Sequence, residues 1–331
     1  MKLLYLSCHA ILEYDELKLF EELGIEYFSL GSYLDPRNPV DAIRPALNSI
    51  RNEKWYNQAP DRNSIPKEFF DDFDVIIVMH VPEWIENNWE NMKHKRVIWR
   101  TIGQSVSDIE RRMKKYVNEG LQIVRYSPRE FAIPDNAGCT QLIRFYKDEN
   151  DFGGWNGLNN EVVTFCQNMK NRGEFCAYEP YLKVTAGLNA KVYGTTNDNL
   201  GSDINGGFLT YAGLKQKMRD ASVYFYVGTQ PASYTLNLLE AMMTGVPIVA
   251  VGDAIGNSMH IAGDTYEVPD IIQNGVNGYC SDSIEELREK IQFLLKNREL
   301  AKHIGQCGRE TAIKLFGKQV VKQAWKDFLG V

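Results

Sequence analysis

A single carboxylate, Glu240, stands out because of the residues that surround it. It falls in a short predicted helix whose other side chains are almost all apolar, namely Leu236, Leu238, Leu239, Ala241, Met242 and Met243. Burying a carboxylate among Leu and Met without a partner costs several kcal/mol or forces the group to take up a proton. A bound ligand that donates hydroxyl groups would satisfy the carboxylate, so Glu240 is a candidate binding residue.

The turn before this helix adds a second kind of chemistry. It follows a predicted strand and carries Gly228, Pro231, Ser233 and Thr235. The helix should therefore begin at the carboxyl edge of a sheet. Free backbone N–H groups and the helix dipole point outward there and favour phosphate groups. The segment predicts a phosphate-binding edge.

Two histidines end predicted strands in the first part of the chain. His9 follows residues 2–7, and His80 follows residues 75–79. The carboxyl ends of parallel strands share one sheet edge, where ligands usually bind. Histidine can exchange a proton near neutral pH. Each histidine is a candidate for chemistry, and a structural role remains an open alternative for each.

The elements that must position these residues alternate regularly along the chain. Predicted strands fall at 2–7, 26–30, 75–79, 96–101, 122–126, 141–145, 162–165, 190–193, 223–226 and 247–251, with helical patterns between most of them, at 82–92 and from 165 to about 186 among others. Capping-box spacing at Ser107 and Glu110, and again at Ser283 and Glu286, predicts two helix starts. This alternation is typical of α/β proteins with parallel, doubly wound sheets.

A turn-rich break at residues 148–160 interrupts the alternation. With 331 residues, the chain exceeds one usual core of roughly 150 residues. We expect two Rossmann-like domains, at 1–150 and 160–317, that face a central cleft. The final segment, 318–331, is predicted as a helix, and its packing back onto the first domain is left open.

Composition restricts the class of protein. Hydrophobic residues make up 44% and charged residues 24% of the chain, as in ordinary globular proteins. The apolar start, MKLLYLSC, is too short for a membrane span and lacks a signal-peptide cleavage site. The six cysteines form no C-x-x-C pair, so we expect reduced thiols and no metal site. A cytoplasmic protein is the expectation.

Charge and aromatic residues gather in two stretches. The stretch from Lys93 to Arg129 contains ten basic and three acidic side chains, although the net charge of the whole chain is −6. This stretch is either a solvated helix face or a surface for DNA or an anionic lipid headgroup. The loop from Gly31 to Asp71 is rich in arginine and aromatic residues and lacks periodicity, which favours contact with a substrate.

The second half of the chain, from Val162 onward, resembles the retaining GT-B glycosyltransferases of family 4. Three segments occur in the family's order: LTYAGLKQKMRDASVYFYVG, LLEAMMTGVPIVAVG and EVPDIIQNGVNGYCSDSIEEL. The second is close to the family signature LLEAMACGVPVVA. The first half matches only in its order of strands and helices.

The resemblance implies roles for individual residues on the donor side. Glu240 matches the second glutamate of the family's Glu-x7-Glu motif, which binds the nucleotide ribose. The first glutamate is replaced by Ala232, which removes a carboxylate that lies near the donor sugar in the family. Ser233, Tyr234 and Thr235 take the positions whose backbone N–H groups face the donor phosphate.

Further roles follow for charged residues outside the signature. Lys170 and Arg172 fall where the family carries cations for the diphosphate, and a nucleotide diphosphate leaving group gains charge there in the transition state. The family often has a histidine from the first domain near the sugar, so His80 or His9 would contact the sugar or the acceptor. The family's Gly-Gly pair in the first loop is absent, replaced by CHAILEYDEL.

Together these matches imply a metal-independent retaining transferase that moves a sugar from a nucleotide diphosphate donor, UDP above all, to a hydroxyl group. No other cofactor is expected. The acceptor is a glycan or lipid intermediate, which would place the protein at the membrane face, or a hydroxymethylated base in viral DNA, which would place it in a host cytoplasm. A different class stays open because of Ala232: a degenerate protein that binds a nucleotide sugar or a partner without catalysis. The sugar and the oligomeric state are left undetermined.

Overall fold

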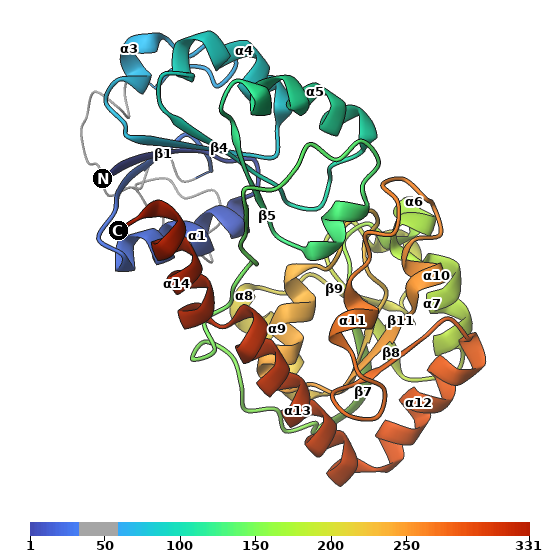
Figure 1. The fold of residues 1–331 in the computed structure, drawn as a ribbon. Helices are drawn as coiled ribbons and strands as arrows, with labels where there is room; N and C mark the ends of the chain where they lie inside the picture. The colour runs from blue at the N-terminus through green and yellow to red at the C-terminus, as the bar shows by residue number, and fades with distance from the viewer. Residues whose placement is uncertain (33–58) are drawn as a thin grey trace. The chain divides into compact units, whose positions relative to one another are not determined.

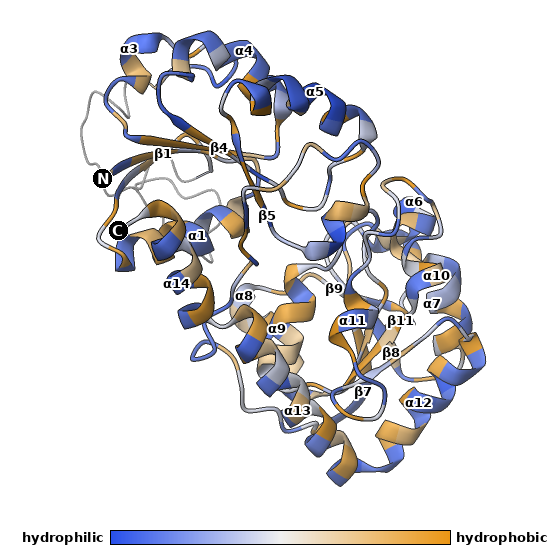
Figure 2. Cartoon of the chain, in the orientation of Figure 1, coloured by the Kyte–Doolittle hydropathy of each residue, from blue (hydrophilic) through white to orange (hydrophobic). Residues whose placement is uncertain are grey.

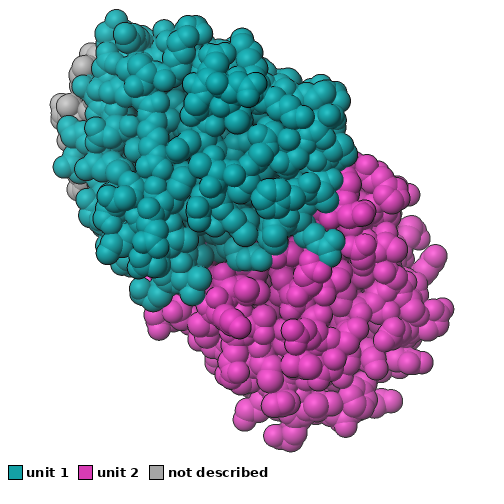
Figure 3. Space-filling model, in the orientation of Figure 1, with its two compact units in different colours: residues 1–145, 319–331 teal, residues 146–318 magenta. Residues whose placement is uncertain are grey.

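The structure is a computed structural model that describes residues 1–32 and 59–331. It divides into two compact units, one formed by Met1–Phe145 with Gln319–Val331 and the other by Tyr146–Lys318 (Figure 3). Each unit contains a parallel sheet with helices on its faces (Figure 1). The predicted fold class, two doubly wound α/β units, is confirmed.

The sheet of the first unit has the strand order β2-β1-β3-β4-β5-β6, and all neighbouring strands are parallel. Its strands are β1 (Lys2–Leu6), β2 (Glu26–Ser29), β3 (Val75–Met79), β4 (Arg96–Arg100), β5 (Gln122–Arg125) and β6 (Gln141–Leu142). Its helices are α1 (Ala10–Glu22), α3 (Lys67–Phe70), α4 (Pro82–Met92), α5 (Ser107–Asn118), the 3-10 helix η1 (Pro128–Ala132) and α14 (Lys318–Leu329).

The sheet of the second unit has the order β12-β11-β10-β7-β8-β9 and is also parallel. Its strands are β7 (Asn159–Phe165), β8 (Ala190–Tyr193), β9 (Asn205–Gly207), β10 (Ala221–Tyr226), β11 (Ile248–Val251) and β12 (Tyr279–Ser281). Its α-helices are α6 (Met169–Arg172), α7 (Tyr178–Thr185), α8 (Tyr211–Asp220), α9 (Leu236–Thr244), α10 (Asp253–Gly256), α11 (Val268–Ile271), α12 (Ile284–Lys296) and α13 (Arg298–Phe316). Two 3-10 helices, η2 (Gly173–Cys176) and η3 (Asp198–Leu200), complete it.

The strand composition explains why both sheets lie inside. All five residues of β3, VIIVM, are buried, as are all four of β11, IVAV. Parallel strands covered by helices on both faces read as continuous apolar runs rather than alternating ones. Strand β11 is hydrophobic in Figure 2, whereas the helix α5 is largely hydrophilic.

Each sheet has one place where the strand order reverses direction. In the first unit it lies between β1 and β3, and in the second between β7 and β10. Loops that leave neighbouring strands there turn to opposite faces and open a crevice at the carboxyl edge, the usual ligand site of such sheets. The fold therefore marks two places for function.

Three local predictions were wrong. The helix expected from 165 to about 186 is broken into α6, η2 and α7, because Asn168 and Ala177 adopt left-handed backbone conformations at φ 51° and 47°. The strand expected at 141–145 has only two residues. Ser107 does not cap α5, since its hydroxyl donates to Asp135.

The other predicted cap was confirmed, since the Ser283 side chain accepts from the Glu286 N–H at 3.2 Å. Most of the long loop expected to contact substrate, residues 33–58, lies outside the described residues.

Candidate functional site

The candidate donor residues gather around the strand reversal of the second unit. Lys170 and Arg172 lie in α6, just after β7, whereas Ser233 to Thr235 and Glu240 follow β10. The Asn237 side chain, in the first turn of α9, donates to the Phe165 carbonyl at the end of β7 at 2.9 Å. This bond fixes α9 against the loop that carries the cations. Tertiary structure thus brings the two predicted groups to one sheet edge.

Glu240 is buried, at 5% exposure, but it has a partner. The Nζ atom of Lys147 lies 2.7 Å from its Oε1 atom, and the lysine side chain is itself only 2% exposed. The expectation that this carboxylate lacks a protein partner was therefore wrong. Lys147 is held in place by its own backbone, which donates to the Phe316 carbonyl at 3.1 Å. A ligand at Glu240 would meet a carboxylate that Lys147 already orients.

The phosphate-facing amides need a correction as well. The Thr235 N–H donates to the Tyr226 hydroxyl at 3.1 Å, so in this structure it does not face an open phosphate site. The Tyr234 side chain is buried, with its ring 5.1 Å from that of Phe316. Ser233 is buried too. The N–H groups of Leu236 and Asn237, in the first turn of α9, have no partner within the helix because helix geometry provides none.

A glutamine that the sequence analysis did not single out builds the turn before α9. The buried Gln230 side chain donates to the Ser258 hydroxyl at 2.9 Å and accepts from the Met259 N–H at 2.9 Å. Its backbone N–H donates to the Phe175 carbonyl at 2.8 Å. Gln230 thereby joins three loops at this edge. A polar residue next to a proline in a turn gave no signal of this role.

The cation loop after β7 depends on a second residue that the sequence analysis missed. The Asn197 side chain donates to the Cys166 carbonyl at 2.7 Å and accepts from the Met169 N–H at 2.9 Å. It therefore holds the start of α6 from the loop after β8. Lys170 is exposed and donates to the Asn199 carbonyl at 3.2 Å, which leaves other Nζ hydrogens for a ligand.

Two thiols lie beside these cations. Interaction with Cys176, together with burial, raises the pKa of Cys166, whereas interaction with Cys166 lowers the pKa of Cys176 to about 7. The positive charge of Arg172 lowers the pKa of Cys176 further.

The two histidines lie at the strand reversal of the first unit, after the neighbouring strands β1 and β3. His9 caps α1, and its Nδ1 accepts from the Leu12 N–H at 3.4 Å. His80 has a left-handed backbone, with φ 58°, which its N–H stabilises by donating to the Arg100 carbonyl at 2.9 Å.

The two histidine rings differ in whether their Nδ1 atom already has a hydrogen-bond partner. The Nδ1 of His80 is buried and has no hydrogen-bond partner among the described residues. Burial lowers the pKa of His80, so its ring is neutral at pH 7. Of the two histidines, His80 thus offers a neutral nitrogen, whereas His9 is committed to helix capping through its Nδ1.

Arg62, the last arginine of the long loop, contacts the same edge. It donates to the Ser7 carbonyl at 2.7 Å, and its guanidinium lies 4.5 Å from the centre of the Trp84 ring. The carbonyl of Ser7 immediately follows β1. The described end of the loop therefore does reach the edge where the histidines lie.

The basic stretch from Lys93 to Arg129 does not form one continuous cationic surface. Arg100 and Arg125 are fully buried, and each pairs with a buried glutamate. Carboxylates also pair with Lys93, Arg111 and Arg112. The sequence count missed most of these partners because they lie outside the stretch. Lys114 and Lys115 stay exposed on α5.

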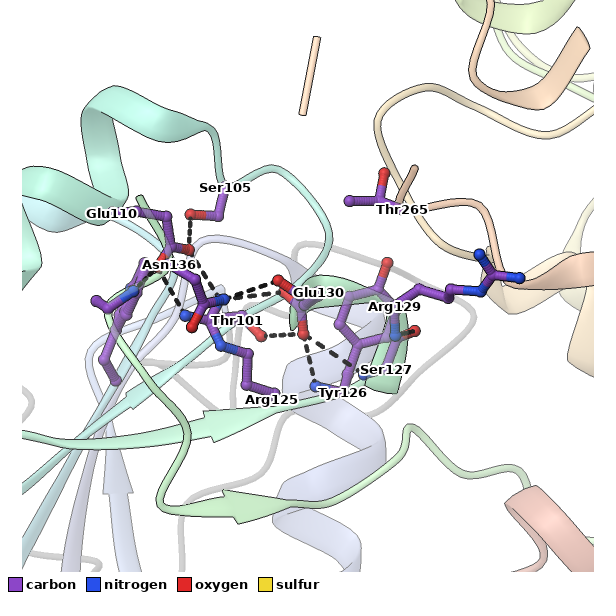
Figure 4. A network of polar contacts seen from close by, with 12 residues as sticks. Thr101, Ser105, Glu110, Arg125, Tyr126, Ser127, Arg129, Glu130, Asn136 and Thr265 are labelled. Carbon is purple, nitrogen blue, oxygen red and sulfur yellow. Dashed lines mark hydrogen bonds and ion pairs between the residues drawn. The ribbon is translucent and has the colours of Figure 1, made fainter. Parts of the chain in front are cut away.

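The buried Arg125 belongs to a polar network (Figure 4). Its guanidinium donates two bonds to Glu110, at 2.6 and 2.8 Å. Glu130 accepts from the Thr101 hydroxyl at 2.7 Å, and burial raises its pKa. The network links β5, α5, η1 and Thr101, the residue after β4, so these charges are held within the fold and are not offered to a ligand.

Within residues 1–32 and 59–331, no helix is long and apolar enough to cross a membrane. The same residues contain no group of three or more His, Cys, Asp or Glu side chains placed to hold a metal ion.

The match to a known protein family lies within one of the two units. Residues 206–311, all within the second unit, match the family model described as "Glycosyl transferases group 1". No curated protein sequence matches the chain.

Solved structures match over almost the whole chain. Sucrose-phosphate synthase from Thermosynechococcus elongatus is similar with a TM-score of 0.69 and 14% identity, covering 99% of this chain and 98% of the other. HepE from Anabaena in complex with UDP is similar with a TM-score of 0.65 and 14% identity, and the match covers both chains completely. An alpha-glucosyltransferase in complex with UDP-glucose and DNA is similar with a TM-score of 0.62 and 13% identity, and the match covers 100% of this chain and 99% of the other. At such identities the similarity establishes the fold. Residues 206–311 are therefore similar to a glycosyltransferase group 1 domain, and the two-unit fold is of the GT-B type.

Proposed function

We propose that this protein is a retaining, metal-independent glycosyltransferase that takes a sugar from a UDP-sugar and transfers it to a hydroxyl group. The observation that carries the proposal is the convergence of Lys170, Arg172 and Glu240 at the strand reversal of the glycosyltransferase domain. These groups fit the two ends of a nucleotide diphosphate, cations for the phosphates and a carboxylate for ribose hydroxyls.

The residues have separate tasks in this proposal. Lys170 and Arg172, with the first-turn amides of α9, stabilise the diphosphate as it leaves with increased negative charge. Glu240 accepts hydrogen bonds from the ribose and positions the donor. His80 carries the neutral nitrogen that contacts the sugar or acceptor, with His9 at the neighbouring strand end. The departing phosphate itself takes the acceptor proton, so no further general base is required.

The choice of UDP is supported by solved relatives in fold. The structures of HepE and of the alpha-glucosyltransferase contain UDP or UDP-glucose. The acceptor is a glycan or lipid hydroxyl or a hydroxymethylated base of DNA. The alpha-glucosyltransferase is in complex with DNA, which supports the second class. The loss of a continuous basic surface counts against it, because phosphate contacts dominate DNA affinity.

A screen of nucleotide sugars for release of the nucleotide diphosphate tests this function. We expect turnover with a UDP-sugar, and we expect kcat/KM to fall at least about tenfold in Lys170→Ala and in Glu240→Gln, the loss of one charge-assisted hydrogen bond. Lys183→Ala, an exposed lysine of α7, is the matched control and should keep full activity.

Two outcomes would contradict the proposal in different ways. If both site variants kept full activity, the donor site would lie elsewhere. If UDP bound but no sugar donor turned over, Ala232 would mark a protein that binds a nucleotide sugar without transferring it. A comparison of hydroxymethylated duplex DNA with glycan and lipid acceptors then separates the acceptor classes.

A further inference from the structure

A cavity in the second unit lies apart from every residue assigned so far. Its volume is about 460 Å³, within the usual range for small-molecule pockets. Helices α8, α9 and α13, which lie side by side in Figure 1, contribute Arg219, Thr244 and Lys302 to its wall. The loop from Phe152 to Trp155 and the side chain of Arg309 complete it.

The cavity is separate from the donor site. Its wall includes Thr244 and Gly245 at the carboxyl end of α9, whereas the proposed phosphate-binding groups, namely Lys170, Arg172 and the first-turn amides of α9, lie at the amino end. A nine-residue helix is about 13 Å long at roughly 1.5 Å per residue. A ligand in the cavity would therefore not overlap a diphosphate held by Lys170 and Arg172.

The lining carries three cations and no carboxylate. Among the described residues, none of Arg219, Lys302 and Arg309 forms an ion pair. Asp220 and Glu310 follow lining residues in the chain but are not part of the lining, and Asp220 accepts from the Asn156 side chain at 2.9 Å and Glu310 from that of Gln306 at 3.2 Å. The cavity is thus electropositive.

One of the three cations has a structural reason to be there. The Arg309 guanidinium donates to the carbonyls of Glu149, at 2.8 Å, and of Phe152, at 3.2 Å, and also to that of Met243 in the last turn of α9. A cation at a helix carboxyl end compensates the helix dipole. Most of the hydrogen bonds that the Arg309 guanidinium can donate are therefore already made to backbone carbonyls.

The other two cations are not explained in this way. Arg219 uses only its Nε, which donates to the Gly153 carbonyl at 2.9 Å, so its four terminal N–H hydrogens remain. Lys302 is exposed, and no hydrogen bond within the described residues engages its Nζ. Arg219 and Lys302 lie on helices and line the same cavity. The loop that also lines it contributes Phe152 and Trp155.

We propose that this cavity binds a phosphate-bearing ligand, with Arg219 and Lys302 holding the phosphate and Arg309 adding its remaining hydrogens. A planar guanidinium beside an ammonium group is a donor set that suits phosphate oxygens. The shared chemistry admits two sources, a free phosphorylated molecule or the headgroup of an anionic phospholipid.

Calorimetric titration with inorganic pyrophosphate tests the cavity in the full chain. The Lys170→Ala/Arg172→Ala background removes the proposed donor-site cations, so binding that remains belongs elsewhere. We expect binding to persist in that background and to weaken at least about tenfold when Lys302→Glu is added. Lys314→Glu makes the same charge change on an exposed residue of α13 outside the cavity, and it should weaken binding less than about twofold.

Sedimentation with vesicles of phosphatidic acid or of phosphatidylcholine separates the two sources. Binding to phosphatidic acid vesicles that Lys302→Glu abolishes assigns the cavity to a headgroup. Pyrophosphate binding without vesicle binding assigns it to a free ligand. Absence of Lys302-dependent binding to either probe, or equal weakening by Lys314→Glu, overturns the proposal.

Discussion

The pair of Lys147 and Glu240 shows that the sequence can predict a residue's need for a partner without predicting the partner itself. The sequence marks Glu240 because a carboxylate in an apolar helix needs a partner. Its partner in the protein, Lys147, is far away in the sequence, so no local pattern points to it. An ion pair buried in this way adds little net stability, but the loss of one member leaves an uncompensated charge. We infer that Lys147 orients the carboxylate for the ribose.

Replacing Lys147 by Met should therefore affect both folding and donor binding. We expect the free energy of unfolding to fall by about 3 to 5 kcal/mol, and UDP affinity to fall with it, because Glu240 would lose the cation that compensates and orients it. Chemical denaturation and UDP titration measure the two effects.

A double variant separates the two roles. Lys147→Met/Glu240→Gln should recover most of the stability, because no unpaired charge remains, but not the affinity for UDP. Lys322→Met, which breaks an ion pair with side chains 25% and 36% exposed, should change stability by no more than about 1 kcal/mol. Unchanged UDP affinity in Lys147→Met would contradict the role of the pair in donor binding.

At the scale of elements, buried arginines at the ends of strands fix the edge of the first sheet. Arg100 ends β4 and pairs with Glu16 of α1 at 2.8 Å, whereas Arg125 ends β5 and pairs with Glu110 of α5. In the sequence these arginines contribute to an apparent basic stretch. Their burial converts them into links between helix and sheet, and it leaves few cations for a polyanion.

Glu110→Gln should destabilise the first unit by about 3 to 5 kcal/mol at pH 7, because Arg125 would keep a buried charge with a weakened partner. The bonds from Arg125 and Ser105 hold the pKa of Glu110 below its ordinary value of 4.5 despite burial, which opposes this shift. The stability that comes from its ionisation is present above pH 4.5 and is lost as the pH falls through the folded-state pKa.

The difference between wild type and Glu110→Gln should therefore shrink below about pH 4.5, which urea unfolding across pH measures. Asp108→Asn, on the same helix but at an exposed ion pair, should cost no more than about 1 kcal/mol at any pH. A difference that stays constant down to pH 3 would show that the ion pair is not its source.

At the scale of the whole molecule, the chain leaves its first unit, builds the second and returns. The last helix, α14, supplies Trp325, which is fully buried with its ring 5.2 Å from that of Phe20 in α1. Arg96 donates to the carbonyl of Phe328 at 2.7 Å. Residues from both ends of the chain thus complete one core, so the first unit cannot be complete until the second has been synthesised.

Trp325→Ala should lower the free energy of unfolding of the first unit by about 3 to 5 kcal/mol, the usual cost of removing a buried aromatic side chain. Trp325→Phe is the matched control and should cost less, since the indole N–H has no hydrogen-bond partner among the described residues. Denaturation followed by circular dichroism measures both. Equal losses for the two variants would mean that ring packing is not the source.

The sequence by itself determined the element pattern, the α/β class and the donor-side motif, because these depend on local periodicity and on short segments. The strand 75–79, the helix 82–92 and the strand 190–193 were predicted with the bounds that the structure has. Glu240 and the helix start before it were visible for the same reason.

Only the tertiary structure decided which groups meet. It placed Lys147 on Glu240, Asn197 on the loop of Lys170, and Tyr226 on the Thr235 amide, and it gathered Arg219 and Lys302 at one cavity. Charge and hydrogen bonding act over a few ångströms in space, and residues so close can lie anywhere in the sequence. Local patterns therefore identify candidate groups, whereas the fold determines whether a group is free to bind a ligand or is already used.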